Sequence, residues 1–468
     1  MGYRNGDVSH WMHAGAAPAF GPAALEDAYD LVVVGGGLTG LWAAYYALQR
    51  DPGARIVVLE AVEVGYGASG RNGGWLSPLL PGNRAVYARQ SESGADGVVA
   101  FQHEMFAAID EVLDVLERED IHADQVRGGQ LTLAPTPAAM ARVKATREAH
   151  LRFGYEPSQV VLLDAEQTRA RVNSVTAHGG LLYPETARVD PAKLTRGLAE
   201  VLRRRGVVIS EHTPAREVTA HRVRTDRGWI DAGRIAVCLE AYTSRLLGGR
   251  KVIPVNSSMI VTDPLPAWAW EQIGWEGREC LNDSAHTFVY AQRTADDRIA
   301  IGGRGTPYKY GSGTPGLGAS DLRTTTNLRR RLETMFPGVY FPVAHAWRGV
   351  IGVTRDWCAT VTHDEQAGVG AVYGFAGHGV TATNLAARTL LDRLDGHDSP
   401  LTRLPWNEHR TRQWEPEPLR WLGVHGMYTL FGLADRWEER TQAEKTALPA
   451  RIGSRIAGLH EGSGRRRG

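Results

Sequence analysis

A glycine-rich turn between a strand and a helix, close to the N-terminus, constrains the fold of this chain more than any other feature. The apolar run from Leu31 to Val34 predicts a short buried strand, and the pattern G-x-G-x-x-G follows it directly. A helix is predicted from Leu38 to Gln49, and a second strand from Arg55 to Leu59 ends next to Glu60. Strand, turn, helix and strand in this order are typical of a Rossmann-like dinucleotide-binding domain.

Each part of this turn has a physical role. Gly35 permits the tight turn, Gly37 lets the backbone approach a pyrophosphate, and Gly40 lets the helix pack closely on the strand. The first helical turn offers N–H groups to the phosphates, and Glu60 can accept hydrogen bonds from ribose hydroxyls, which disfavours NADP. The residues expected to bind the dinucleotide are Gly35, Gly37, Leu38, Thr39, Gly40, Glu60 and Ala61. The pattern alone does not distinguish NAD from FAD.

The composition excludes several other classes of protein. The 53 Lys and Arg residues nearly balance the 52 Asp and Glu residues, which argues against nucleic-acid binding as the main function. Cys238, Cys280 and Cys358 are far apart with no C-x-x-C pair, which excludes a zinc ribbon, a disulfide framework and a redox-disulfide flavoenzyme. We recognise no secretory signal, and glycines interrupt the longest apolar run, Leu31 to Leu48. We therefore expect a cytoplasmic protein without a membrane span.

The rest of the chain alternates between helical and strand patterns. Asp190 and Pro191 predict the N-cap and first turn of a helix that Gly206 ends. Further helices are predicted at 101–119 and 380–394, and strands at 129–133, 180–183, 207–210, 229–239 and 372–375. After Pro254 the runs SSMIVT, HTFVYAQR and DRIAIGGRG predict an antiparallel sheet. The residues from Trp414 onward are predicted to be helical.

Four blocks of sequence carry a resemblance to a known group of enzymes. They are GGGLTG with Glu60, the loop GASGRNGGW, the segment GGLLYPETARVDPAKLTRGLAEVLRRRGV, and HAWRGVIGVTRD followed by YGFAGHGVTATNLAARTLLDRL. With these blocks the chain resembles the D-amino-acid-oxidase-like superfamily of FAD-dependent oxidoreductases, near the γ-glutamylputrescine oxidoreductase and aminophosphonate oxidoreductase branch. The resemblance covers about residues 28–395 and does not specify a substrate.

The resemblance implies an FAD cofactor bound without a covalent bond. Paired glycines allow a close backbone approach, Arg and Asn side chains offer donors, and a helix start favours negative charge on the reduced ring. The implied contacts are Ala68, Ser69, Arg71, Asn72, Gly73 and Gly74 in the loop, and Gly377, His378, Gly379, Val380 and Thr381 at the late helix. Cys358 is displaced from the place where sarcosine oxidase relatives attach flavin, and no metal is expected.

By analogy, the fold is α/β, with a Rossmann-like FAD domain interleaved with an α+β substrate domain that contains a mixed or antiparallel sheet. The FAD domain would comprise residues 28–80, 185–247 and 345–395. The substrate domain would comprise residues 81–184 and 248–344. Residues 396–468 would form a helical C-terminal appendage.

Amine oxidation in this superfamily is hydride transfer from a C–H bond beside nitrogen to flavin N5, and the resulting imine hydrolyses. The protein supplies binding, orientation and electrostatics. The expected catalytic residues are His378, Arg348, Tyr290 and Arg304, with Tyr308 and Trp347 as further pocket candidates. For Arg304 and Arg348, a structural salt bridge is an equally good interpretation. Tyr290 and Trp347 are better explained by packing in the core, and His286 and His345 are expected to have structural roles.

The electron acceptor is either molecular oxygen or another molecule. In several oxidases of this group a Lys near the flavin promotes the reaction with oxygen. The chain has five Lys residues, and only Lys251 and Lys309 are candidates for that role.

Three other functions are less well supported. An aromatic-hydroxylase-type monooxygenase would carry a G-D motif where this chain has YGFAGHGV, and the run Trp268 to Trp275 lacks the proline of a tryptophan halogenase motif. An FAD-binding protein without turnover is disfavoured by the intact Arg71 and Asn72 loop. A tailoring step on a natural product remains an alternative substrate class.

Overall fold

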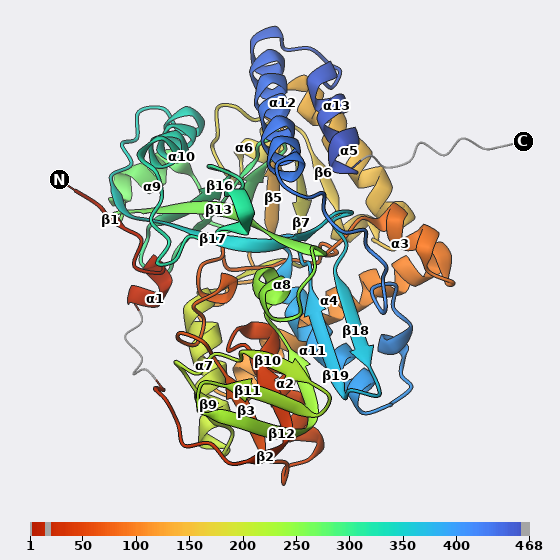
Figure 1. The fold of residues 1–468 in the computed structure, drawn as a ribbon. Helices are drawn as coiled ribbons and strands as arrows, with labels where there is room; N and C mark the ends of the chain where they lie inside the picture. Colours follow the sequence, from red (N-terminus) through yellow and green to blue (C-terminus); the bar gives the residue numbers. More distant parts are fainter. Residues whose placement is uncertain (1, 15–19, 460–468) are drawn as a thin grey trace, which may run out of the picture.

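The predicted strand–turn–helix–strand unit forms the centre of a sheet in the lower part of the molecule (Figure 1). The computed structural model describes residues 2–14 and 20–459, and within them this first sheet has eight strands. Parallel pairing joins β12 to β2, β2 to β3, β3 to β9 and β12 to β19. The strands are β2 (Ala28–Val34), β3 (Ile56–Leu59), β9 (Val208–Ser210), β10 (Glu217–Thr219), β11 (Arg222–Thr225), β12 (Gly228–Val237), β18 (Thr360–Asp364) and β19 (Val369–Tyr373).

Alternate residues of the central strands enter two different cores. Leu31 and Val33 pack against the helices on one face, and Val32 and Val34 pack beneath the antiparallel strands β10 to β12 on the other, as expected when successive side chains point to opposite faces of a sheet. The helices of the first face are α2 (Leu38–Arg50), α4 (Gly94–Arg118), α7 (Pro191–Arg204) and α11 (Gly379–Leu394). Burial of this sheet on both faces explains its continuous apolar strands.

A second, mixed sheet lies above the first (Figure 1) and has nine strands in the described ranges. Pairing is antiparallel except between β1 and β17 and between β14 and β5. The strands are β1 (Arg4–Asn5), β5 (Gln130–Leu133), β6 (Val161–Leu163), β7 (Gly180–Tyr183), β13 (Val252–Thr262), β14 (Cys280–Asp283), β15 (Val289–Arg293), β16 (Ile299–Gly303) and β17 (Val343–Thr354). Helices α9 (Ala267–Ile273) and α10 (Leu322–Met335) pack on one face of it. The mixed α/β fold class predicted from the sequence is confirmed.

The chain passes repeatedly between the two sheets. Residues 345–354 were expected in the cofactor domain, but β17 pairs with β13 over its whole length and therefore belongs to the second sheet. The other predicted domain boundaries stay predictions. Shorter elements lie between the sheets in the chain: β4 (Trp75–Leu76), α3 (Arg84–Gln90), β8 (Ala187–Arg188) and α8 (Thr243–Leu246). Helices α5 (Pro137–Arg152) and α6 (Ala165–Arg169) instead join strands of the second sheet.

The N-terminal arm, for which the sequence pattern gives no prediction, joins the second sheet. Strand β1 pairs parallel with β17, and α1 (His10–Ala14) follows it. The side chains of Ser9 and Trp11 donate hydrogen bonds to the carbonyl oxygens of Gly70, at 2.5 Å, and Asn72, at 3.0 Å. The arm therefore holds the loop that the resemblance assigns to the flavin.

Two helices near the C-terminus, α12 (Leu419–Thr441) and α13 (Leu448–Ala457), form a pair at the top of the molecule (Figure 1). They match the predicted helical tail, whose last nine residues, 460–468, lie outside the described residues. Helix α4 begins seven residues before the predicted start at Phe101, because two glycines weaken the helical pattern there. None of the helices in the described ranges is long and apolar enough to cross a membrane.

Candidate cofactor and substrate site

A cavity of about 440 Å³ lies at the carboxyl ends of the parallel strands of the first sheet, the edge at which open α/β sheets bind ligands. Its wall combines the turn after β2, the ends of β3 and β12, the loop at residues 66–72 and the start of α11. The predicted cofactor residues in this wall are Gly35, Gly37, Leu38, Thr39, Glu60, Ala61, Ala68, Ser69, Asn72, Gly377, Gly379 and Val380. Gly40, Arg71, Gly73, Gly74, His378 and Thr381 lie behind or beside it.

The three glycines of the turn are required by the space around them. Gly35 has φ +112°, and a Cβ atom there would lie 2.6 Å from the carbonyl oxygen of Cys238. A Cβ atom on Gly40 would overlap the carbonyl oxygen of Gly35. Gly37 faces Ser69, whose hydroxyl accepts the Leu38 N–H at 2.9 Å. The turn thus forms a cradle lined by backbone atoms, and larger side chains at these three glycine positions would fill it.

Glu60 lies at the end of β3 and lines the cavity. One carboxylate oxygen accepts the Gly36 N–H at 2.8 Å and the other accepts the Val62 N–H at 2.9 Å. Each oxygen keeps a second lone pair for a ligand hydroxyl. Burial raises the pKa of this carboxyl group above its ordinary value.

Arg71 joins the flavin loop to the second sheet. Its Nε donates to the Tyr66 carbonyl at 2.8 Å, and its Nη1 donates to the Arg348 carbonyl at 3.1 Å. Nη2 is buried without a hydrogen-bond partner among the described residues, and so is the hydroxyl of Thr381 in the first turn of α11. Buried donors without partners fit a polar ligand between these two segments.

Asn72 shapes the loop instead of offering a donor, which corrects the role expected from the sequence. Both of its amide hydrogens are used, by the carbonyl oxygens of Ala68 and Ser69, and its own oxygen accepts the Gly74 N–H. Gly73 makes room for the ring of Tyr290, since a Cβ atom would lie 2.9 Å from it.

The helix start at α11 resembles the one at α2 in lacking a side-chain cap. Gly377 has φ +104°, and His378 precedes the first helical residue without capping it. Uncapped N–H groups at a helix start favour a bound anion or a polar group of a ligand. Together, the glycine cradle, Glu60 and the buried donors without partners fit an FAD molecule.

Glu240 also lines the cavity, although no sequence pattern predicted it. One of its carboxylate oxygens accepts the N–H groups of Gly352, at 3.2 Å, and Phe375, at 3.1 Å, and the other accepts that of Gly374 at 2.9 Å. It therefore connects the end of β12 to β17 and to the turn before α11. Burial raises its pKa to about 7. Its position at the carboxyl end of a parallel strand was the one signal that could have identified it.

Replacing Glu240 with Gln is expected to change how stability depends on pH. The pKa of the folded chain, about 7, exceeds the ordinary value of 4.5, so the unfolded chain loses this proton first as the pH rises. As the pH rises from about 4.5 to about 7, the Glu240 carboxyl group therefore lowers the stability of the folded chain. Gln does not titrate, so the variant shows no such loss. Thermal unfolding below and above the window should show wild type losing stability relative to the variant as the pH rises. A constant difference would contradict this assignment.

The positive charge of Arg304 acts on two of the other expected catalytic residues, Tyr290 and His378, and none of these three residues is in the cavity wall. The Tyr290 hydroxyl is 2.9 Å from the Ser257 hydroxyl, and Gly302 leaves space for its ring. Desolvation of the ring by the surrounding protein lowers the pKa of His378 below its ordinary value, and the positive charges of Arg304 and Arg84 add to the effect. Its imidazole is therefore neutral at physiological pH.

Arg348 does not join this group, contrary to the sequence-based expectation. Its neighbour Trp347 donates an indole hydrogen bond to the Arg71 carbonyl at 3.0 Å, on the side of the flavin loop. Because side chains alternate along a strand, that of Arg348 points to the other face, where Ser258 lies opposite and the negative charge of Asp321 acts on it.

The remaining candidates have structural partners. The hydroxyl of Tyr308 donates to Glu417 at 2.7 Å, and a ring nitrogen of His286 lies 3.0 Å from a carboxylate oxygen of Glu438. His345 pairs with the Gly6 carbonyl at 2.7 Å. The described residues Lys251 and Lys309 are not in the cavity wall.

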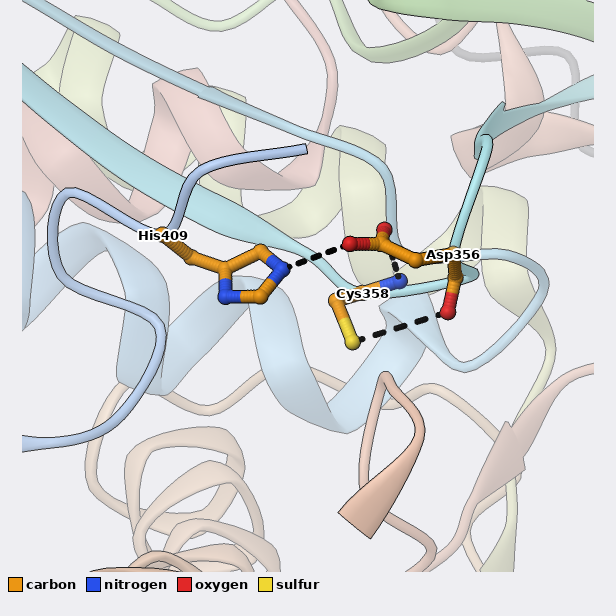
Figure 2. Close-up of side chains that lie close together, drawn as sticks. All are labelled: Asp356, Cys358 and His409. Atoms are coloured by element: carbon orange, nitrogen blue, oxygen red, sulfur yellow. Dashed lines mark hydrogen bonds and ion pairs between the residues drawn. The ribbon is translucent and has the colours of Figure 1, made fainter. Parts of the chain in front are cut away.

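A cluster of Asp356, Cys358 and His409 has the residue types of a metal site (Figure 2). Asp356 accepts hydrogen bonds from His409 at 2.9 Å and from the Cys358 N–H at 3.3 Å, whereas Nδ1 of His409 is buried without a partner among the described residues. Burial raises the pKa of the Cys358 thiol well above its ordinary value, so the thiol stays protonated. Its sulfur faces Asn83 and Asp356, which argues against attachment to a flavin as well as against a metal.

These features define a dinucleotide-binding protein with a Rossmann-like cofactor site. The chain belongs to the DAO family of FAD dependent oxidoreductases, whose model matches residues 30–393. It is 29% identical to the gamma-glutamylputrescine oxidoreductase of Escherichia coli (strain K12) over 379 residues, which is 78% of this chain and 84% of that protein. It is 25% identical to the probable oxidoreductase OrdL of Haemophilus influenzae over 397 residues, or 82% and 86%.

Solved structures share the fold at lower identity. The glycine oxidase from Geobacillus kaustophilus superposes with a TM-score of 0.68 at 18% identity, covering 82% of this chain and 99% of that one. The L-proline dehydrogenase from P. horikoshii superposes with a TM-score of 0.66 at 17% identity, covering 82% of this chain and 98% of that one. The chain is therefore an FAD-dependent enzyme with this fold.

Proposed function

We propose that the enzyme oxidises the C–N bond of a primary or secondary amine or an amino acid. The chemistry that bound FAD supplies is acceptance of a hydride at N5 from the carbon beside the nitrogen. The oxidised substrate is an imine, which water converts to a carbonyl compound and a free amine. The names of relatives and structural neighbours, which include gamma-glutamylputrescine oxidoreductase, glycine oxidase and L-proline dehydrogenase, support this substrate class.

The family match over residues 30–393 carries the proposal, and within it we assign Tyr290, Arg304 and His378 to the substrate. A neutral His378 does not repel an amine and can accept a hydrogen bond from it. The guanidinium of Arg304 can bind a carboxylate when the substrate is an amino acid. The hydroxyl of Tyr290 can orient the polar end of the substrate. Gly35, Gly37, Gly40, Glu60, Arg71, Thr381 and the start of α11 would hold the cofactor.

The competing functions make different predictions. L-2-hydroxyglutarate dehydrogenase of Escherichia coli also matches, but over only 47% of this chain, so hydroxy acids are the second substrate class. Anaerobic mixing with a panel of amines, amino acids and 2-hydroxy acids should bleach the visible flavin absorbance only with an amine or amino acid. Bleaching by 2-hydroxy acids alone, or by no member of the panel, would contradict the proposal. Re-admission of oxygen then distinguishes an oxidase from a dehydrogenase.

Arg304→Ala is expected to weaken amino-acid binding and to spare amines without a carboxylate. Loss of a hydrogen bond to a charged group costs about 1.5–3 kcal/mol, so KM for an amino acid should rise by roughly 10- to 150-fold. Steady-state kinetics measure both substrate types. Arg330→Ala, an exposed arginine on α10, is the control and should change neither value. An equal rise for both substrate types would show that Arg304 does not bind the carboxylate.

A further inference from the structure

Helix α13 carries its large apolar side chains on the solvent side. Leu448 is 64% exposed, and Ile452 and Ile456 are 43% and 44% exposed. The side that packs on α12 is made instead of small residues, Ala450, Gly453 and Ala457, which are buried. An ordinary surface helix has the opposite arrangement, with its large apolar residues turned toward the core.

The exposed residues of α13 form one continuous stripe. The spacing of four residues between Leu448, Ile452 and Ile456 places them above one another on a single helix face. Helix α12 has a similar outer row, since Leu419, Leu422, Leu433 and Trp437 are all exposed, whereas its Met427 and Phe431 pack inward with α13. Single exposed apolar residues are common, but continuous stripes mark surfaces that bind a partner.

The charges next to the stripe are positive. Arg451 and Arg455 are exposed on α13, one residue before Ile452 and Ile456 respectively. From Leu448 to Ala457 the helix contains these two arginines and no acidic residue, in a chain whose total charge is +1. An isologous contact between two copies of this surface would place arginines against arginines. The charge instead complements an anionic surface.

We propose that α13, supported by α12, rests on an anionic lipid surface. The stripe would enter the boundary between headgroups and acyl chains, and the arginines, whose long stems reach past an apolar stripe, would contact the phosphate groups. With ten residues, α13 is too short to span a bilayer, so the attachment is peripheral. Contacts of α12 with the second sheet, such as Glu438 with Arg142 at 2.8 Å, would hold the rest of the enzyme at that surface.

Co-sedimentation of the full-length holoenzyme with vesicles tests this proposal. Binding is expected to vesicles that contain phosphatidylglycerol, to be at least about tenfold weaker with phosphatidylcholine alone, and to decrease at high salt, because screening weakens exposed charge contacts. The double variant Ile452→Glu, Ile456→Glu should lose the binding. Its side chains are already exposed, so the fold and the flavin spectrum should not change. Leu322→Glu, at a 70% exposed leucine on α10, is the control and should bind like wild type.

Three results would overturn the proposal. The first is equal sedimentation with and without phosphatidylglycerol. The second is vesicle binding that the double variant retains although it is folded and flavin-loaded. The third is a change from dimer to monomer in the double variant without lipid, measured by light scattering, which would assign the stripe to contact between copies of the chain.

Discussion

Gly40→Ala is expected to give a protein that does not retain FAD. A Cβ atom at this position would overlap the backbone oxygen of Gly35 and would lie 2.8 Å from a side-chain methyl of Val33. Neither the turn nor the strand can yield without moving the cavity wall. Overpacking of this kind costs about 3 kcal/mol or more. The purified variant should be colourless, with a lower melting temperature, and should not recover the flavin spectrum when FAD is added.

Gly423→Ala is the matched control, because Gly423 is also a helical glycine but has no atom within 4 Å of a Cβ position. It should keep FAD and gain up to about 1 kcal/mol, since alanine is the better helix former. A yellow, fully active Gly40→Ala protein would show that close packing of α2 on the glycine turn is not required for cofactor binding.

Arg71→Ala is expected to have the second largest effect. The change removes two hydrogen bonds from a charged donor to the Tyr66 and Arg348 carbonyls and the stacking of the guanidinium on the Tyr66 ring at 4.5 Å. At about 1.5 kcal/mol for each hydrogen bond, the loss is about 3 kcal/mol, which corresponds to roughly a 100-fold weaker FAD affinity if it falls on binding. Titration of the apoprotein with FAD, monitored by flavin fluorescence, measures this affinity.

Arg293→Ala provides the comparison for Arg71. Arg293 is also buried and also lies over an aromatic ring, that of Trp270, at 3.9 Å, but it is in the second sheet and outside the cavity wall. Its replacement should lower the melting temperature and leave FAD affinity within about twofold of wild type. If the two variants lose stability equally and both keep FAD affinity, Arg71 is a structural residue only.

Much of the fold could be predicted because local patterns decide it. Strand β2 ends and helix α2 begins at the predicted residues. Strand β2 begins three residues earlier than predicted, and α2 ends one residue later. Asp190 caps α7 through the N–H groups of Ala192 and Lys193, as its sequence context predicts. Each of these signals depends on residues close together in the chain.

The rest depends on contacts between distant residues. Arg348 points away from the cavity because of the pairing register between β17 and β13, which no local pattern specifies. Glu240 receives its N–H donors from residues more than a hundred positions away. Asn72 has its role because the loop folds back on its amide group. Sequence patterns identified residue types suited to the site but not the directions of their side chains.

The sequence does not identify the electron acceptor either. The scarcity of lysine leaves Lys251 and Lys309 as the candidates for promoting reaction with oxygen, and neither is in the cavity wall that the described residues form. The family match covers residues 30–393 and so excludes α12 and α13.

The flavin content of the purified protein decides whether this chain is an FAD enzyme. After denaturation, the released FAD is separated from the protein, and its amount is divided by the amount of protein. We expect close to one FAD per chain for wild type, no flavin left on the polypeptide, and almost none in Gly40→Ala. A wild-type protein that carries no FAD and binds none on reconstitution, or one whose flavin stays attached to the chain, would show that non-covalent FAD is not its cofactor.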